Sequence, residues 1–156
     1  MIFVTVGTQL HFDRMMEIVD DWSSKNNNKV FCQTGPTQLK FENCEQKNFI
    51  TPLEYVDLIK NCDVVVAHAG IGSILSAMEY KKPIIIFPRK ASLGEHRNEH
   101  QLATARQFES KSGIYVAYSR EELISLLNQH KTFKMTGNFA PFANKVLLNS
   151  IKEFIN

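Results

Sequence analysis

Short runs of almost wholly apolar residues alternate along this chain with segments whose apolar residues recur at helical spacing. This alternation limits the fold more than any other feature, because parallel strands covered by helices on both faces are apolar at nearly every position. The apolar runs predict strands at residues 2–6, 29–34, 48–50, 63–67, 83–87 and 114–118. Their alternation with helices predicts the α/β class, with a doubly wound, mostly parallel sheet.

The segments between these runs have the periodicity of amphipathic helices. The apolar residues from Met15 to Trp22 follow the i, i+3, i+4, i+7 pattern, and Pro52 stands at a favourable first position of the next helix. Helices are therefore expected around 15–22 and at 52–62, 72–81, 98–110, 120–130 and 141–155, with an extended loop at 131–141. The broad apolar stripe of the last helix leaves two interpretations open, which are packing on the chain's own core and docking on a partner.

Length, charge and cysteine content describe an ordinary globular protein. The 156 residues, 44% hydrophobic and 22% charged, predict a single domain over 1–156. A net charge of +2 without a dense Lys/Arg block argues against nucleic acid as a partner.

The three cysteines form no C-x-x-C pair, which argues against a disulfide framework or structural zinc and fits a reducing cytoplasm. MIFVTVG, the first seven residues, has no signal-peptide features, and no apolar run is long enough to span a bilayer.

Small and polar residues follow four of the predicted strands. They are Gly7-Thr8-Gln9, Gln33-Thr34-Gly35, the segment 68–73 and Pro88-Arg89. In open α/β sheets, ligands bind outside the carboxyl ends of the strands, so these segments are expected to meet at one binding edge.

The segment AHAGIGS, residues 67–73, joins a predicted strand to a predicted helix. Gly70 and Gly72 let a ligand approach the backbone, Ser73 can donate its hydroxyl, and the first N–H groups of the helix have no partner. These features predict a diphosphate site, while the alternative is a tight turn with Ser73 as a cap. The segment is neither G-x-G-x-x-G nor a Walker loop, which argues against dinucleotides and ATP hydrolysis.

A second polar segment, GEHRNEHQ at 94–101, follows the strand at 83–87. Its imidazoles, amides and carboxylates suit sugar hydroxyls, which both donate and accept hydrogen bonds. The alternatives are a solvated loop with Asn98 as a helix cap, and a metal site at His96 and His100. His68 is either a ligand-facing residue or a core-edge histidine. His11, which follows the first strand's loop, is a candidate to face the same cleft and a weak candidate for a general base.

Taken in order, VTVGT, QTG, AHAGIGSILSAMEYKKPIIIFPR and GEHRNEHQLATA resemble glycosyltransferase family 28, in its C-terminal, donor-binding half. The resemblance covers nearly the whole chain and implies a Rossmann-like domain that forms one half of a GT-B glycosyltransferase. The chain resembles the stand-alone subunits of this family, found in the two-subunit UDP-GlcNAc transferase and in bacterial exopolysaccharide or capsule synthesis. In those systems a membrane-associated partner supplies the acceptor-binding half.

The resemblance also implies roles for individual residues. UDP and its diphosphate would contact His68, Gly70, Gly72, Ser73, Glu79, Pro88 and Arg89. The sugar would contact Gly7, Thr8, Glu99, His100 and Gln101. Many family members carry Glu seven residues before the proline that corresponds to Pro83, where it holds the ribose. Here that position is Ser76, and Glu79 is expected to replace it.

The activity implied is inverting transfer of GlcNAc or another hexose from a UDP-sugar to a lipid-linked glycan, by a cytoplasmic protein held at the membrane through its partner. Backbone amides at the helix terminus would stabilise the leaving diphosphate, so neither a cofactor nor an obligatory metal is expected. The base would be His11 or a group of the partner. An alternative function is that of a non-catalytic subunit that stabilises or anchors a separate transferase. A nucleotide-sugar epimerase is disfavoured by length, because such enzymes hold both halves in one chain.

Overall fold

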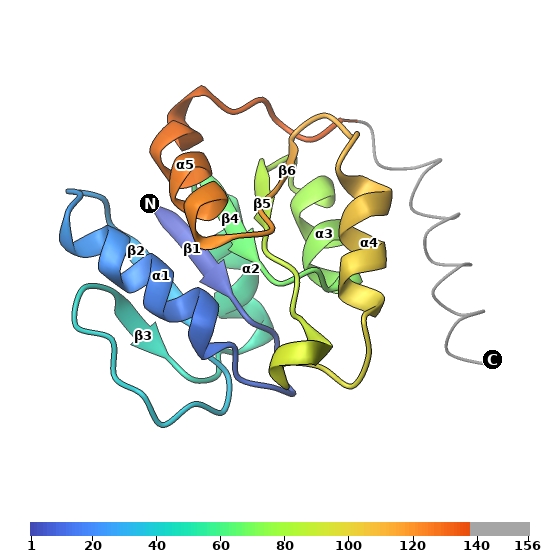
Figure 1. The fold of residues 1–156 in the computed structure, drawn as a ribbon. Helices are drawn as coiled ribbons and strands as arrows, with labels where there is room; N and C mark the ends of the chain where they lie inside the picture. Colours follow the sequence, from blue (N-terminus) through green and yellow to red (C-terminus); the bar gives the residue numbers. More distant parts are fainter. Residues whose placement is uncertain (138–156) are drawn as a thin grey trace.

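The computed structural model describes residues 1–137 of the chain, and the helix expected at 141–155 lies outside them. In the described part, six strands form one sheet in the order β3-β2-β1-β4-β5-β6 (Figure 1). The strands are β1 (Ile2–Thr5), β2 (Val30–Gln33), β3 (Glu45–Lys47), β4 (Val64–Ala67), β5 (Ile84–Ile86) and β6 (Ile114–Val116). Every neighbouring pair is parallel, which confirms the doubly wound α/β prediction.

The sheet order reverses between β1 and β4. After β1 the chain adds β2 and β3 on one side, and then returns to place β4 on the other side of β1. The register pairs Thr5 with Gln33 of β2 and with Ala67 of β4, so the carboxyl ends of these strands are level. A crevice opens at such a reversal because the connections leave the sheet in opposite directions.

Helices cover both faces of the sheet (Figure 1). On one face, α1 (Asp13–Ser24) and α5 (Arg120–Gln129) pack against a core that includes Ile2 and Val4 of β1. On the other face, α2 (Pro52–Asn61), α3 (Ile71–Glu79) and α4 (His100–Phe108) pack on a core that includes Phe3. Successive residues of β1 thus point into opposite cores, which explains why Ile2, Phe3 and Val4 are all apolar. Two short 3₁₀ turns, Ala91–Leu93 and His130–Thr132, complete the regular structure of this part.

The strand predicted at 48–50 is wrong in position, because β3 comprises Glu45–Lys47. Among the strands of residues 1–137, β3 is an edge strand that pairs with β2 alone, and its side chains are exposed or half-buried. An edge strand with little burial has no need of an apolar run, so the apolar signal was misleading here. Phe49, in the middle of the strand predicted at 48–50, is 56% exposed.

The helices predicted within 1–137 are confirmed, with ends that differ from the structure by two residues or fewer at 52–62, 72–81, 98–110 and 120–130. Side chains cap two of them. Thr51 and Glu54 form a capping box at the start of α2, and Ser119 accepts a hydrogen bond from the N–H of Glu122 in α5. The N-cap residue of helix α3 is Gly70, which has no side chain to cap the helix.

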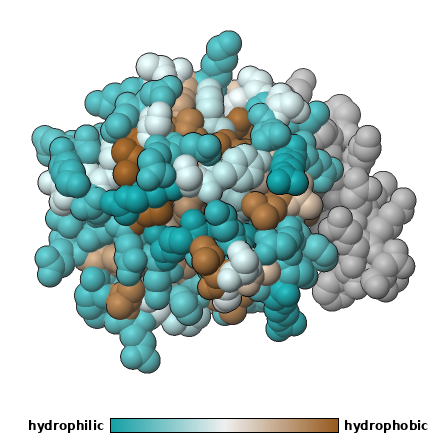
Figure 2. Space-filling model, viewed as in Figure 1, coloured by the Kyte–Doolittle hydropathy of each residue, from teal (hydrophilic) through white to brown (hydrophobic). Residues whose placement is uncertain are grey.

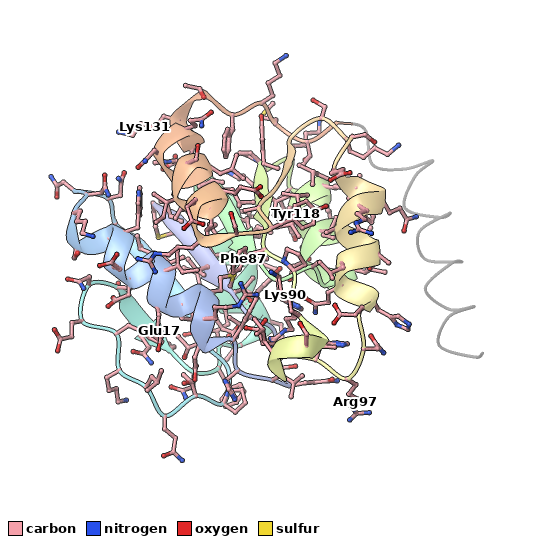
Figure 3. The ribbon with its side chains drawn as sticks, viewed as in Figure 1. Glu17, Phe87, Lys90, Arg97, Tyr118 and Lys131 are labelled. Carbon is pink, nitrogen blue, oxygen red and sulfur yellow. The ribbon has the colours of Figure 1, made fainter. Side chains whose placement is uncertain are left out.

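Polar and charged side chains dominate the surface seen in Figure 2, with apolar residues scattered between them. Phe87, labelled in Figure 3, lies in the middle of the molecule and is fully buried. Within residues 1–137, every helix is too short or too polar to cross a bilayer.

Candidate functional site

A cleft of about 430 Å³ opens at the carboxyl edge of β1, β4 and β5, next to the reversal in strand order. It is lined by Val6, Gly7, Thr8, Gln9, Leu10, His68, Gly72, Arg89, His96 and Gln101. The structure therefore brings together six of the predicted site residues, which come from the segments following β1, β4 and β5 and from α4.

The N-terminus of α3 faces this cleft without a cap. Its first N–H groups have no partner within the helix, and within residues 1–137 no side chain accepts a hydrogen bond at the Gly70 cap position. A Cβ atom added to Gly72 would have no described atom within 4 Å. Gly72 does not have a left-handed φ angle, so neither crowding nor backbone conformation requires glycine there. The open space above Gly72 is part of the cleft.

Gly70 and Gly7 have a different role, because both leave room for the imidazole of His68. A Cβ on Gly70 would stand 2.2 Å from Cε1 and 2.7 Å from Nε2 of His68. A Cβ on Gly7, whose φ is +78°, would stand 3.1 Å from the same Nε2. Burial lowers the pKa of His68 to about 3, and the charges of Arg89 and His96 contribute in the same direction. His68 is therefore neutral at physiological pH.

The side chain of Gln101, the second residue of α4, is 6% exposed and joins three segments of the site. Its Oε1 accepts hydrogen bonds from the N–H of Ala69 at 3.2 Å and from the N–H of Arg89 at 3.0 Å. Its Nε2 lies 3.0 Å from Nδ1 of His68. Gln101 thus ties the segment after β4 to the segment after β5.

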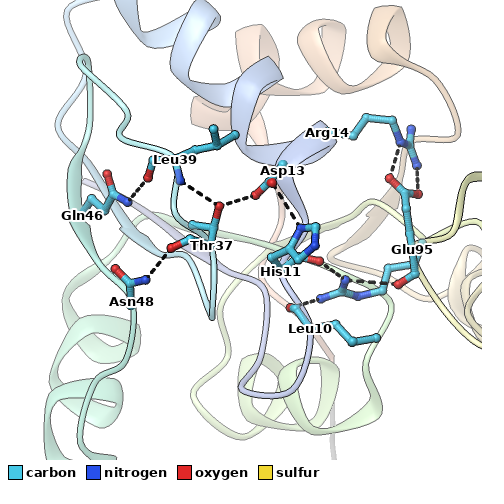
Figure 4. A network of polar contacts seen from close by, with 10 residues as sticks. Leu10, His11, Asp13, Arg14, Thr37, Leu39, Gln46, Asn48 and Glu95 are labelled. Carbon is cyan, nitrogen blue, oxygen red and sulfur yellow. Dashed lines mark hydrogen bonds and ion pairs between the residues drawn. The ribbon is translucent and has the colours of Figure 1, made fainter.

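The guanidinium of Arg89 holds the loop that follows β1. Its nitrogens donate to the carbonyl oxygens of Val6 (2.7 Å), Leu10 (2.8 Å) and His11 (2.6 Å), and Arg89 is only 2% exposed. Figure 4 shows Leu10 and His11 of this loop, with the Arg14 and Glu95 side chains paired nearby. Burial lowers the pKa of Arg89 to about 10, so the guanidinium stays charged at neutral pH. Within the described residues, no carboxylate lies at salt-bridge distance from it.

The remaining predicted UDP residues do not line the cleft with their side chains. Ser73 is buried, and its hydroxyl and that of Ser76 hydrogen-bond to Tyr55, which lowers the pKa of Tyr55 against the larger, raising effect of burial. Glu79 is the last residue of α3 and is exposed, about seven residues of helix away from Gly72. Pro88 precedes Arg89 and accepts a hydrogen bond from Arg14 through its carbonyl oxygen.

The other predicted residues lie at the rim. Glu99 accepts a hydrogen bond from the N–H of Ser92, and His100 is the exposed first residue of α4. His11 lies in a neighbouring hollow, where its Nδ1 is 3.2 Å from the carboxylate of Asp13. The ligand roles assigned to all of these residues from sequence stay predictions.

Two residues of the cleft, Val6 and Leu10, are not among those that the sequence places at the binding edge. Gln9 and His96 also line the cleft. The sequence places Gln9 at the binding edge after the first strand and His96 in the polar segment 94–101, as a sugar contact or a metal ligand. Arg97, the next residue, projects outward from the molecule in Figure 3.

The cleft is electrostatically suited to an anion. Arg89 is its one permanently charged residue among those described, and no Asp or Glu lines it. The uncapped N-terminus of α3 adds the positive end of a helix dipole. Among residues 1–137, no group of three or more His, Cys, Asp or Glu side chains is arranged to hold a metal ion.

Comparison with known proteins gives a match over residues 1–153 to the model of the "Glycosyltransferase family 28 C-terminal domain". The chain is similar to a Clostridium botulinum (strain Hall) UDP-N-acetylglucosamine–N-acetylmuramyl-(pentapeptide) pyrophosphoryl-undecaprenol N-acetylglucosamine transferase, with 33% identity over 97% of this chain and 42% of that protein. It is also similar to the UDP-N-acetylglucosamine transferase subunit ALG13 of Candida albicans, with 33% identity over 49% of this chain and 24% of that protein. The chain thus spans less than half the length of these curated relatives.

Solved structures share the fold. The solution structure of ALG13 superposes with a TM-score of 0.59 at 18% identity, covering 89% of this chain and 88% of that one. The glycosyltransferase of kitacinnamycin gives a TM-score of 0.63 at 15% identity, over 83% of this chain and 34% of that one. These neighbours confirm the Rossmann-like fold predicted for one half of a GT-B glycosyltransferase.

Proposed function

Because this chain belongs to glycosyltransferase family 28, through that family's C-terminal domain, we propose that it is the donor-binding subunit of an inverting glycosyltransferase. It binds a UDP-sugar and passes GlcNAc or another hexose to a lipid-linked glycan. The relatives support this donor, since both curated proteins described above are named as N-acetylglucosamine transferases and one is named as a UDP-N-acetylglucosamine transferase subunit.

The observation that carries the proposal is Gly72 at the uncapped start of α3. A helix position that has glycine without steric or conformational need, and that opens into a cleft, is suited to close approach by a ligand. The unpaired N–H groups beside it are donors for phosphate oxygens. The buried positive charge of Arg89 in the same cleft favours the same ligand.

The proposed pose follows from this arrangement. The diphosphate lies on the first N–H groups of α3, next to His68 and within the field of Arg89. The uracil follows the backbone at Pro88 and Arg89. The sugar extends toward the loop at Gly7 and Thr8 and toward the rim at Glu99 and His100. Negative charge grows on the diphosphate as UDP leaves, and donors already fixed by the fold stabilise it without an obligatory metal.

The base that activates the acceptor hydroxyl is assigned to the partner or, less directly, to His11. No carboxylate lines the described cleft, and His11 lies in the hollow next to it. We propose that a membrane-associated partner supplies the acceptor-binding half and holds this chain at the cytoplasmic side of the membrane. The name of the ALG13 relatives, a transferase subunit, supports a two-subunit enzyme.

Calorimetric titration of the purified chain with UDP, with ADP and GDP as controls and with and without EDTA, tests the proposal. Selective binding of UDP that survives EDTA is the expected result. Gly137→Ala is a control for variants of Gly72, because a Cβ on Gly137 would likewise have no described atom within 4 Å, and Gly137 does not line the cleft. Absence of UDP binding by the chain and by its complex with a co-expressed partner would instead favour a non-catalytic subunit.

A further inference from the structure

The orientation of the Gln101 side-chain amide is set by the backbone around it. Two N–H donors, from Ala69 and Arg89, point at the same end of the amide. An NH₂ group accepts no hydrogen bond, so that end must be the oxygen. The assignment of oxygen and nitrogen in this amide therefore follows from its hydrogen-bond partners.

This orientation decides which nitrogen of His68 carries the proton. The amide nitrogen of Gln101 lies 3.0 Å from Nδ1 of His68 and can only donate. Nδ1 must accept, and therefore carries no hydrogen. A neutral imidazole has one N–H, which is then on Nε2.

The Nε2 atom of His68 lies close to Gly7, which lines the cleft, and to Gly70. The imidazole lines the cleft, and among residues 1–137 no hydrogen-bond partner is found for Nε2. The charges that act on the ring are those of Arg89 and His96, and among residues 1–137 no hydrogen bond joins either of these side chains to Nε2. An N–H donor without a partner is thus held at the wall of the cleft.

We propose that Gln101 is a positioning residue, which fixes His68 as the neutral tautomer protonated on Nε2 and so presents an N–H donor to an anionic oxygen in the cleft. The ligand part of this inference rests on the proposed function, with the diphosphate as the anion. The tautomer part stands on the geometry alone. Gln101 acts from behind the imidazole, with all three of its hydrogen bonds made inside the protein.

The tautomer can be measured without any ligand, by long-range ¹⁵N–¹H NMR correlations of the histidine rings. His130 is an internal reference of the opposite kind, because its Nδ1 lies 2.7 Å from the carbonyl oxygen of Leu127 and must donate. We expect His68 to show the Nε2–H pattern between pH 5 and 8, with its signals assigned by their loss in His68→Gln. Protonation on Nδ1, or a mixture of tautomers, would overturn the proposal.

The variant Gln101→Glu tests, by the same NMR measurement, whether Gln101 sets the tautomer of His68. A carboxylate can still accept from Ala69 and Arg89, but it cannot donate to His68. We expect this variant to move the proton of His68 to Nδ1, while Gln107→Met, an exposed change on the same helix, leaves the tautomer as it is. An unchanged tautomer in a folded Gln101→Glu protein would refute the assignment.

The consequence for the ligand is tested by UDP titration of Gln101→Met in two backgrounds. With His68 present, loss of an oriented donor to a charged oxygen is expected to weaken binding at least about tenfold. In His68→Gln, where an amide supplies the donor, the same change should cost clearly less. Equal losses would mean that Gln101 only tethers the loops, which contradicts the proposed route through His68. If the wild-type chain binds no UDP, the proposed function fails, whereas the NMR result still decides the tautomer.

Discussion

Replacing Gly72 with alanine is expected to stabilise the folded chain and to weaken its binding of UDP. The two effects have opposite signs because they depend on different neighbours. The added methyl group meets no described atom of the protein, so folding gains from the lower flexibility of alanine in the unfolded chain. In the proposed complex, the same methyl group stands where the diphosphate approaches the helix.

The size of the stability effect follows from the position of Gly72 near the start of α3. Glycine in the middle of a helix costs up to about 1 kcal/mol relative to alanine, and the first turn is less demanding, so a gain of about 0.5 kcal/mol is expected. For a chain of this length, that gain corresponds to a rise in Tm of about 1–2 °C. Losing one hydrogen bond to a charged oxygen weakens UDP binding about tenfold or more.

Gly70→Ala is the informative contrast, although the two glycines are only two residues apart. Its Cβ would overlap the imidazole of His68, with Cε1 at 2.2 Å, and that ring is fixed by Gln101 and packed against Gly7. Overpacking of this kind costs about 1–3 kcal/mol. Adding His68→Ala to Gly70→Ala removes the overlap, so the two changes should be strongly non-additive in stability.

Urea denaturation gives the free energies of unfolding, and calorimetry gives the UDP affinities, for the two glycine variants and for Gly137→Ala. The reasoning is refuted if Gly72→Ala destabilises the protein, because the position would then be crowded or conformationally strained. It is equally refuted if Gly72→Ala binds UDP as well as the wild type does. A Gly70→Ala protein as stable as the wild type would show that His68 is free to move.

Three further predictions concern the elements around the cleft. Arg89→Met leaves the carbonyl groups of Val6, Leu10 and His11 without their hydrogen-bond donor. This change should lower the free energy of unfolding, measured by urea denaturation, by about 2–4 kcal/mol and should abolish UDP binding. Thr51→Ala removes the capping box with Glu54 and should cost about 1 kcal/mol by the same assay without affecting UDP affinity, so a change in affinity would contradict the separation of α2 from the cleft. The lowered pKa of His68 predicts a loss of stability on acidification: between pH 6.5 and about 3 the unfolded chain binds a proton there and the folded chain does not. Stability should fall with pH by up to about 1.4 kcal/mol per unit from this residue, and His68→Gln should show a shallower slope than the wild type.

The layout of the fold could be predicted from sequence because most strands are buried on both faces. The continuous apolar runs of β1, β4 and β5 mark them directly. Apolar runs do not mark β3, because Glu45–Lys47 pair at the edge of the sheet through their backbone. Edge pairing makes no demand on side-chain polarity, so a periodicity argument has nothing to detect there.

The location of the site could be predicted from the sequence, but the separate roles of its residues could not. Gly70 and Gly72 look alike in the sequence, yet the structure shows that the first makes room for His68 and the second opens into the cleft. The family resemblance assigns Arg89 to UDP and Gln101 to the sugar, and the structure adds that both side chains make hydrogen bonds within the protein. Such roles depend on contacts between residues distant in sequence, which spacing and composition do not record.

The attachment of Arg89 to the loop after β1 has a consequence for the kinetics of recognition. A loop held by several carbonyl bonds to one buried guanidinium has little conformational entropy left to lose when a ligand arrives. The rate at which the ligand meets the cleft then depends mainly on its diffusion in the electric field of the Arg89 guanidinium and the α3 dipole. The association rate constant should therefore be high and should fall as ionic strength rises. The dissociation rate constant, set by short contacts inside the cleft, should depend much less on salt.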